Sequence, residues 1–237
     1  MHRAGPNAPE VLPTRRAWAT VGHIFLSGTV HPMPMPLILG LLGSPLPRGN
    51  TARLLERALA GAAEAGCTVE RVNVPLLTFE PCMEILHCMN QPECAQIDDL
   101  TPYYDTVAQA DGIVIATPVM TMGVPGKLKG FMDRFQVFYW AKYGRKQPMV
   151  PTERRRQRHG LLLAISGLSR DHAPNVFDGV RASTASFFDI VNVTPGEELL
   201  IDDMDGKRDL SRFPALLDEA HGMGRRLGER ACGGSAP

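Results

Sequence analysis

The apolar residues of this chain fall into short continuous runs separated by longer segments of mixed character. Three runs, at residues 37–42, 112–117 and 160–165, contain almost no polar side chain. Runs of this length without alternation are typical of strands that are buried on both faces, as in a parallel sheet covered by helices. Two further strands are predicted at 68–74 and near 190–193. The pattern therefore predicts a five-stranded parallel sheet.

Between these runs, apolar residues recur at helical spacing. The clearest case follows the first run, where Leu54, Leu55, Ala58 and Leu59 would share one helix face. Further helices are predicted at about 102–110, 126–139, 175–188 and 213–232. Alternating strands and helices with right-handed crossovers give an α/β, doubly wound sheet with helices on both faces.

Residues 1–35 lack this pattern and are rich in proline and glycine. Their apolar stretch, at 17–30, is interrupted by His23 and is too short to span a membrane. We expect an N-terminal extension over 1–35, either a flexible tail or an arm that contacts a partner subunit. The α/β domain is expected over 36–237.

Composition and charge narrow the choice of partners. A chain of 237 residues is long enough for one α/β domain with a sizeable core. Its 25 basic and 25 acidic residues cancel, so neither nucleic acid nor a membrane is an expected partner. Five cysteines, an odd number without obvious pairing, favour a reducing compartment and hence the cytoplasm.

The loop at 43–51 separates the first strand from its helix and is made of small and polar residues. The first amides of a helix have no partner inside it and carry partial positive charge, so they suit an anion. Ser44, Asn50 and Thr51 add donors, and Arg48 adds a charge. The lysine of a nucleoside-triphosphate loop and the dinucleotide glycine pattern are both missing. This favours a terminal monophosphate such as that of FMN, although an ordinary turn capped by Asn50 or Thr51 fits equally well.

The loop at 118–125 follows the third predicted strand. Two prolines restrain it, and Gly123 allows close approach to its backbone. Val119, Met120 and Met122 could form an apolar wall for a flat ring system. Alternatively, the methionines simply cover the end of the sheet.

Together these segments resemble a known family. GSP at 43–45 and GNT at 49–51 are similar to the phosphate loop of flavodoxin-like NADPH-dependent FMN reductases. Residues 111–118 and GKLKGFMDR at 126–134 resemble the flavin loop and following helix of that family. The resemblance covers about residues 36–200. One departure is Met120-Thr121-Met122, which stands where the family usually has an aromatic residue.

The resemblance implies a flavodoxin-like fold with bound FMN and with NAD(P)H as co-substrate. The implied cofactor-binding residues are Ser44, Arg48, Asn50 and Thr51 for the phosphate, Pro118, Val119, Met120, Thr121, Met122 and Gly123 for the ring and ribityl chain, and Ser166 and Gly167 for the ring edge.

Three cysteines, Cys82, Cys88 and Cys94, follow the second strand at C-x5-C-x5-C spacing. Thiolates at such spacing could hold a metal or a cluster. The iron–sulfur flavoprotein branch of the family carries four cysteines here, and Ile85 stands at the position of the second. A four-iron cluster as a rule needs four ligands, so we expect no metal and a loop that instead shapes a substrate pocket.

Two neighbouring features concern partners. The charge run at 142–159 is expected to be a solvated loop, or otherwise a site for the 2′-phosphate of NADPH. The aromatic residues Phe135, Phe138, Tyr139 and Trp140 could pack on a second subunit in a homodimer, or within the core.

The predicted function is an FMN-dependent NAD(P)H oxidoreductase that passes a hydride through FMN to a quinone, another aromatic acceptor or free flavin. The flavin carries the chemistry, so no catalytic side chain is predicted. Two alternatives stay open: an electron-transfer protein with FMN and an iron–sulfur centre, and a flavodoxin-like binding module without turnover.

Overall fold

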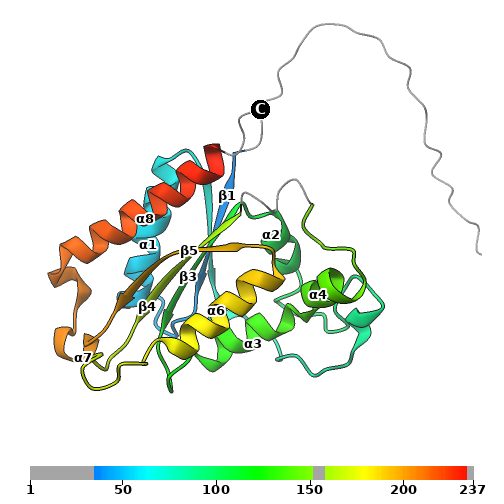
Figure 1. Ribbon diagram of the computed structural model, residues 1–237, viewed down its shortest axis with the longest axis horizontal. Coiled ribbons are helices and arrows are strands. Elements are labelled where there is room, and N and C mark those ends of the chain that lie inside the picture. Colours follow the sequence, from blue (N-terminus) through cyan, green and yellow to red (C-terminus); the bar gives the residue numbers. More distant parts are fainter. Residues whose placement is uncertain (1–34, 152–157, 234–237) are drawn as a thin grey trace, which may run out of the picture. The chain divides into compact units, whose positions relative to one another are not determined.

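A computed structural model describes residues 35–151 and 158–233, and its centre is one parallel five-stranded sheet (Figure 1). The strand order is β2-β1-β3-β4-β5. This is the order of flavodoxin-like sheets, so the predicted fold class is confirmed. Residues 1–34, which make up nearly all of the predicted extension, lie outside the described residues. The strands are β1 (Leu37–Leu42), β2 (Thr68–Asn73), β3 (Gly112–Pro118), β4 (His159–Ile165) and β5 (Thr194–Ile201).

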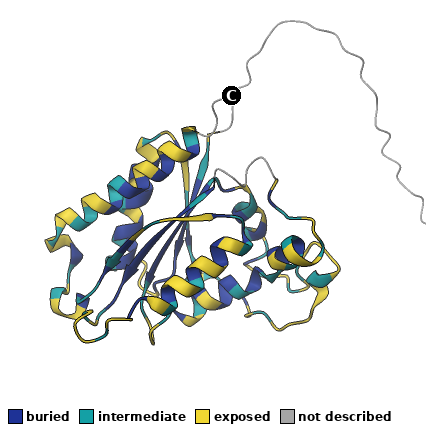
Figure 2. Ribbon diagram, in the orientation of Figure 1, coloured by how far each residue is buried: buried dark blue, intermediate teal, exposed yellow. Residues whose placement is uncertain are grey.

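Helices cover both faces of the sheet (Figure 1). On one face α1 (Asn50–Glu64) packs against α8 (Pro214–Gly233), and their apolar side chains form one core layer with β1, β3 and β4. On the other face lie α2 (Tyr103–Gln109), α3 (Gly126–Arg134) and α6 (Asp178–Ile190), which form the second core layer. Figure 2 shows that burial is concentrated along the sheet and on the inner sides of these helices.

Close packing of α1 against α8 depends on glycine. A Cβ atom added to Gly224 would lie 1.8 Å from the carbonyl oxygen of Ala58, and one added to Gly61 would lie 2.1 Å from that of His221. Any larger residue at either position would therefore separate the two helices. This contact lies in the second half of α1 and sets the distance between the two helices there.

Shorter elements connect the main ones. The predicted helix at 126–139 is divided at Phe135 into α3 and α4 (Gln136–Tyr139), and a π-helical segment, Trp140–Gly144, follows. A short helix, α7 (Met204–Lys207), follows β5. Single 3-10 turns occur at Val74–Leu76, His87–Met89 and Leu210–Arg212. None of the described helices is both long enough and apolar enough to cross a bilayer.

The predicted position of the fifth strand is wrong. The apolar residues Val191 and Val193 are buried beneath the end of α6, and Asn192 between them turns the chain with φ +58°. The strand itself, β5, lies at the sheet edge, and Glu197 and Glu198 within it pair with arginines of α8 and α6. An edge strand with charged residues does not show the continuous apolar run used to find the others.

The charge run at 142–159 is only partly a solvated loop. Arg158 is completely buried, and its guanidinium donates hydrogen bonds to the carbonyl oxygens of Val107, Ala110 and Val191. These carbonyls lie at the ends of α2 and α6, where a cation is stabilising. The other arginines at 154–156 lie outside the described residues.

The aromatic residues after α3 divide between the two expectations. Phe135 and Phe138 are core residues, with 0% and 2% of their surface exposed. Tyr139 and Tyr143 are exposed, and their rings lie 5.2 Å apart between centroids. Trp140 is half-buried, so of the four predicted aromatic residues Tyr139 is the most exposed, and it lies beside the exposed Tyr143.

Candidate functional site

The carboxyl ends of β1, β3 and β4 lie next to one another at one edge of the sheet. Leu42 of β1 pairs in register with Ala116 of β3, and Pro118 of β3 pairs with Ile165 of β4. The loops that follow are joined by backbone bonds: the Gly43 N–H donates to the Ala116 carbonyl at 2.8 Å, and the Val119 N–H donates to the Ile165 carbonyl at 2.7 Å. The predicted phosphate loop and the 118–125 loop therefore start side by side.

The start of α1 is open to an anion. Gly49 is the N-cap, and among the described residues no side chain caps this helix and no acidic residue lies in its first turn. The first-turn amides therefore keep their partial positive charge and their donor capacity. Ser44 and Thr51 are nearly buried beside them, and the Ser44 hydroxyl accepts a hydrogen bond from the Leu46 N–H at 3.2 Å.

The other two predicted phosphate residues lie differently. Arg48 is exposed, so its guanidinium can reach an anion only from the solvent side. The Asn50 side chain donates to the Arg208 carbonyl at 2.9 Å and accepts from the Leu210 N–H at 3.1 Å. Asn50 thus links the segment after α7 to the start of α1. Because its side chain is engaged in these two bonds, the group that Asn50 can donate to an anion is its backbone amide. Sequence reasoning missed this long-range contact.

The 118–125 loop contains a tight, strained turn. Met120 and Gly123 exchange both backbone hydrogen bonds, at 2.9 and 3.0 Å. The two residues between them, Thr121 and Met122, have φ values of +49° and +61°. Two positive φ values define a type I′ turn, which normally uses asparagine and glycine. Strain of this kind in non-glycine residues is concentrated at functional sites.

The strained turn is supported by α6 and presents apolar side chains to solvent. A Cβ atom at Gly179, in the first turn of α6, would lie 2.2 Å from the Met122 carbonyl oxygen, so the backbones touch. Met120 and Met122 are 43% and 39% exposed. The alternative that these methionines are core residues is therefore wrong, and the turn presents them as an accessible apolar surface.

The loop after β4 is covered by α7. Ser166 is buried, its N–H donates to the Ile201 carbonyl at 2.8 Å, and its own carbonyl accepts from the Met204 N–H at 2.9 Å. Gly167 lies against the Asp205 carboxylate, where a Cβ atom would be 2.7 Å from the oxygens. The sequence analysis did not predict α7. Asp205, which belongs to this helix, is therefore a polar group at this edge that the sequence analysis missed.

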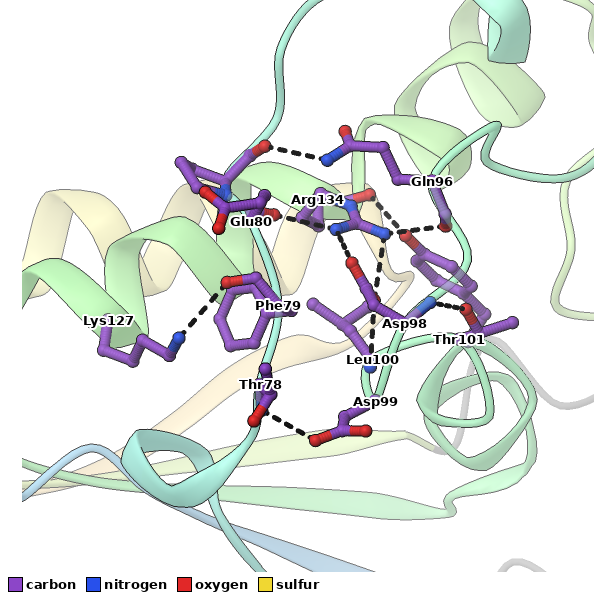
Figure 3. Close-up of polar contacts among 12 residues, drawn as sticks. Thr78, Phe79, Glu80, Gln96, Asp98, Asp99, Leu100, Thr101, Lys127 and Arg134 are labelled. Atoms are coloured by element: carbon purple, nitrogen blue, oxygen red, sulfur yellow. Dashed lines mark hydrogen bonds and ion pairs between the residues drawn. The ribbon is translucent and has the colours of Figure 1, made fainter.

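A second region, the cysteine loop (residues 81–95), is held at its neck by Arg134 (Figure 3). The Arg134 guanidinium donates to the carbonyl oxygens of Glu80 and Gln96, at 2.8 and 3.0 Å, and to the Asp98 carboxylate at 2.6 Å. Both ends of the loop are therefore bound to one side chain of α3.

Arg134 is 1% exposed and remains charged. Burial alone would lower its pKa, but the hydrogen bond to Asp98, together with Tyr104 and Cys94, raises the pKa above its ordinary value. A buried, paired and fully ionised arginine of this kind makes a rigid anchor.

Further contacts hold the loop and the segment just before it. The Lys127 ammonium donates to the Phe79 carbonyl at 3.2 Å and lies 4.1 Å from the centroid of the Phe79 ring. The Arg145 guanidinium donates to the Cys88 carbonyl. The cysteine loop is therefore built on the helix that begins directly after the strained turn.

The cysteine loop, α3, α4 and the following π-helical segment enclose a cavity of about 480 Å³, which we call the cysteine cavity. Its walls carry three thiols, apolar groups, carboxylates and amides: Cys82, Glu84, Ile85, Leu86, His87, Cys88, Cys94, Ala95, Gln96, Asp133, Gln136 and Trp140.

The three thiols are half-buried and free. Burial raises the pKa of the Cys88 thiol, and the neighbouring Cys94 and Cys82 raise it further, as expected for sulfur atoms around a common space. Within residues 35–151 and 158–233, however, no group of three or more histidine, cysteine, aspartate or glutamate side chains is arranged to hold a metal ion.

The strand order and the loops at one sheet edge define a flavodoxin-like α/β protein. The family model described as NADPH-dependent FMN reductase matches residues 36–192, and the chain belongs to this family.

Similar proteins fall into two groups by name. An iron–sulfur flavoprotein of Methanocaldococcus jannaschii is 36% identical over 97 residues, which cover 41% of this chain and 50% of the relative. An FMN reductase (NADPH) of Pseudomonas putida is 33% identical over 98 residues, 41% of this chain and 45% of the relative. The chain thus spans about half the length of the curated relatives it matches.

Solved structures agree with the fold. The NAD(P)H:quinone oxidoreductase from Methanothermobacter marburgensis superposes with a TM-score of 0.62 at 19% identity, covering 82% of this chain and 96% of that one. At this identity the likeness supports the shared architecture, and the site rests on the geometry above.

Proposed function

We propose that this protein is an FMN-dependent NAD(P)H oxidoreductase. The observation that carries the proposal is the placement of the uncapped start of α1 beside the strained 120–123 turn, at one edge of the sheet. An anion site next to an accessible apolar surface suits a molecule with a phosphate at one end and a flat ring system at the other. Membership of the FMN reductase family supports the same cofactor.

Each part of the site has a role in this proposal. The first-turn amides of α1, with the Ser44 and Thr51 hydroxyls, hold the phosphate, and Arg48 screens it from the solvent side. Residues 118–123 support the ring and ribityl chain, with the Thr121 and Met122 amides available to its polar edge. Ser166 and Gly167 lie along the ring edge, close to Asp205.

The bound flavin would supply the redox chemistry, by taking two electrons from NAD(P)H and passing them to an acceptor. The chain binds, orients and shields the reactants. The acceptor is a quinone, another aromatic compound or free flavin. The quinone oxidoreductase neighbour supports this group of acceptors. We further propose a cytoplasmic homodimer, with the exposed Tyr139 and Tyr143 at the subunit contact.

The test compares two threonine substitutions. Thr51→Val removes a hydroxyl from the proposed phosphate site, and we expect the Kd for FMN to rise about tenfold, the effect of one charge-assisted hydrogen bond. Thr184→Val is the control, because within the described residues the buried Thr184 hydroxyl has no hydrogen-bond partner. Equal FMN affinity in both variants, measured by flavin fluorescence titration, would contradict the phosphate assignment.

The cysteine cavity favours a second candidate, an electron-transfer protein that carries FMN and an iron–sulfur centre. Three thiols face one cavity, and several relatives are named iron–sulfur flavoproteins. Iron and acid-labile sulfide analysis of anaerobically purified protein separates the two functions. Stoichiometric iron would favour the second candidate, and its lack would favour the first.

A further inference from the structure

A pair of thiols lies at the edge of the sheet opposite the candidate site. The Sγ atoms of Cys67 and Cys232 lie 3.7 Å apart, although the two residues are 165 positions apart in the chain. Cys67 directly precedes β2, and Cys232 lies in the last turn of α8 (Figure 1). We propose that this pair is a redox-sensitive modification site, where hydrogen peroxide forms a disulfide that joins the end of α8 to the start of β2.

Backbone contacts hold the two cysteines beside each other. The Cys67 N–H donates to the Ala62 carbonyl at 3.2 Å, so the end of α1 fixes its position. Gly228 lies four residues before Cys232, on the same face of α8. A Cβ atom added to Gly228 would lie 2.8 Å from the Cβ of Ala65, so α8 is in close contact with the end of α1 here. The fold itself therefore brings the two sulfur atoms together.

The geometry allows a bond between them. A disulfide has an S–S distance of about 2.05 Å, so the sulfur atoms need to approach by about 1.7 Å. The Cys67 thiol donates to the Gly228 carbonyl at 3.6 Å, and the Cys232 thiol donates to the Ala65 carbonyl at 3.3 Å. Thiols are weak donors, so breaking these contacts costs little. The last turn of a helix frays readily, and the end of α8 can supply the remaining shift.

The two thiols differ in access and in reactivity. Cys67 is 6% exposed, whereas Cys232 is half-buried, so peroxide reaches Cys232 first. Burial raises the pKa of the Cys67 thiol, and the neighbouring Cys232 and Asp111 raise it further. Cys67 therefore stays protonated at neutral pH and is a poor nucleophile toward peroxide. This difference makes Cys232 the sulfur that is oxidised first and Cys67 the one that closes the bond.

The reaction balances with peroxide as the oxidant. The Cys232 sulfur attacks one oxygen of peroxide, the O–O bond breaks, and the departing hydroxide takes the thiol proton and leaves as water. This step leaves a sulfenic acid on Cys232. The Cys67 sulfur then attacks the Cys232 sulfur, the S–O bond breaks, and the second hydroxide leaves as water with the Cys67 proton. The two thiols lose two electrons and two protons, and peroxide gains them.

The disulfide would stabilise the domain without reaching the candidate site. It would close a loop that runs from β2 to the end of α8, and cross-links that close long loops restrict the unfolded chain most. Thr68, next to Cys67, pairs with Leu37 at the start of β1, whereas the predicted phosphate loop follows Leu42 at its other end. Oxidation should therefore raise the stability of the protein and leave its affinity for FMN unchanged.

Peptide mapping and thermal unfolding test the proposal. Fully reduced full-length protein is treated with hydrogen peroxide, its remaining thiols are alkylated, and it is digested with trypsin without reductant. We expect the main cross-link to join the peptides 58–71 and 231–237, which contain Cys67 and Cys232. The Tm should rise by about 5 °C or more, and dithiothreitol should reverse the rise. Lack of this cross-link, or a lower Tm in the oxidised protein, would overturn the proposal.

Two alanine substitutions separate this pair from the other thiols. Cys232→Ala should abolish both the cross-link and the rise in Tm. Cys82→Ala is the control, because it removes another half-buried thiol, from the cysteine loop, and should keep both effects. A rise in Tm that persists in Cys232→Ala, or that is lost in Cys82→Ala, would overturn the proposal.

Two further measurements test the part played by the fold. Peroxide treatment in guanidinium chloride, where the five thiols can pair in several ways, should give the 58–71/231–237 cross-link only as a minor product. An equal share in folded and unfolded protein would contradict the placement of the pair. A changed Kd for FMN after oxidation would contradict its separation from the candidate site. Cross-linking and Tm need no flavin, so failure of the proposed function leaves this inference standing.

Discussion

The two ends of α3 serve two regions that are built in different ways. At its beginning, the sheet edge and the strained 120–123 turn are shaped by backbone: strand ends, a helix start and a type I′ turn. Beyond its middle, the cysteine cavity depends on one buried side chain, Arg134, which binds both ends of the loop. The difference indicates that the shape of the first region follows from the fold itself, whereas the shape of the second depends on one side chain.

The largest expected effect comes from breaking the neck of the cysteine loop. Arg134→Met would leave the Asp98 carboxylate, with 18% of its side chain exposed, without its partner. Removing one member of such a pair typically costs about 3–5 kcal/mol. We expect urea denaturation to show a loss of this order, with limited proteolysis directed to residues 81–95.

Arg181→Met is the matched control, because Arg181 and Glu198 form an ion pair at 2.7 Å whose side chains are 50% and 37% exposed. Exposed pairs contribute about 1 kcal/mol or less. Equal losses from the two substitutions would show that Arg134 is no special anchor, and the contrast between the two regions would fail.

A smaller effect of opposite sign is expected at the strained turn. Replacing Thr121-Met122 by Asn-Gly supplies the residues that a type I′ turn prefers. Relief of two unfavourable φ values should raise the free energy of unfolding by about 1–2 kcal/mol. The same thermal or urea measurement would show no gain if the two residues were unstrained.

The smallest effect is a change in thiol reactivity inside the cavity. Burial and the neighbouring Cys94 and Cys82 raise the pKa of the Cys88 thiol. The double substitution Cys82→Ser/Cys94→Ser removes two of the causes that raise the pKa of Cys88, so this pKa falls and more thiolate forms at a given pH. The pH profile of Cys88 alkylation, followed by mass spectrometry, should therefore move to lower pH. An unmoved profile would mean that the three sulfur atoms do not share one space.

Sequence alone predicted the region built from backbone better than the region built from side chains. The runs at 37–42 and 112–117 were correctly predicted as the strands β1 and β3, because central parallel strands need continuous apolar residues. The fifth strand was misplaced because an edge strand lacks that signal. The three cysteines were visible in the sequence, but their common cavity depends on Arg134 and Asp98, which are 36 residues apart.

Several contacts within the candidate site could not be predicted from the sequence, for similar reasons. The 43–51 and 118–125 loops were predicted as parts of the site because each directly follows a predicted strand. The engagement of Asn50 with Arg208, and the cover of Ser166 by α7, involve residues distant in sequence that show no local motif. The positive φ values of Thr121 and Met122 could not be foreseen, because neither residue type favours them.

The most direct test of the central claim is a comparison of FMN with riboflavin, which lacks the phosphate. If the open start of α1 holds the phosphate through two or more charge-assisted hydrogen bonds, FMN should bind at least about 100-fold more tightly than riboflavin. Equal dissociation constants for the two flavins, measured by fluorescence quenching on the same protein, would contradict it.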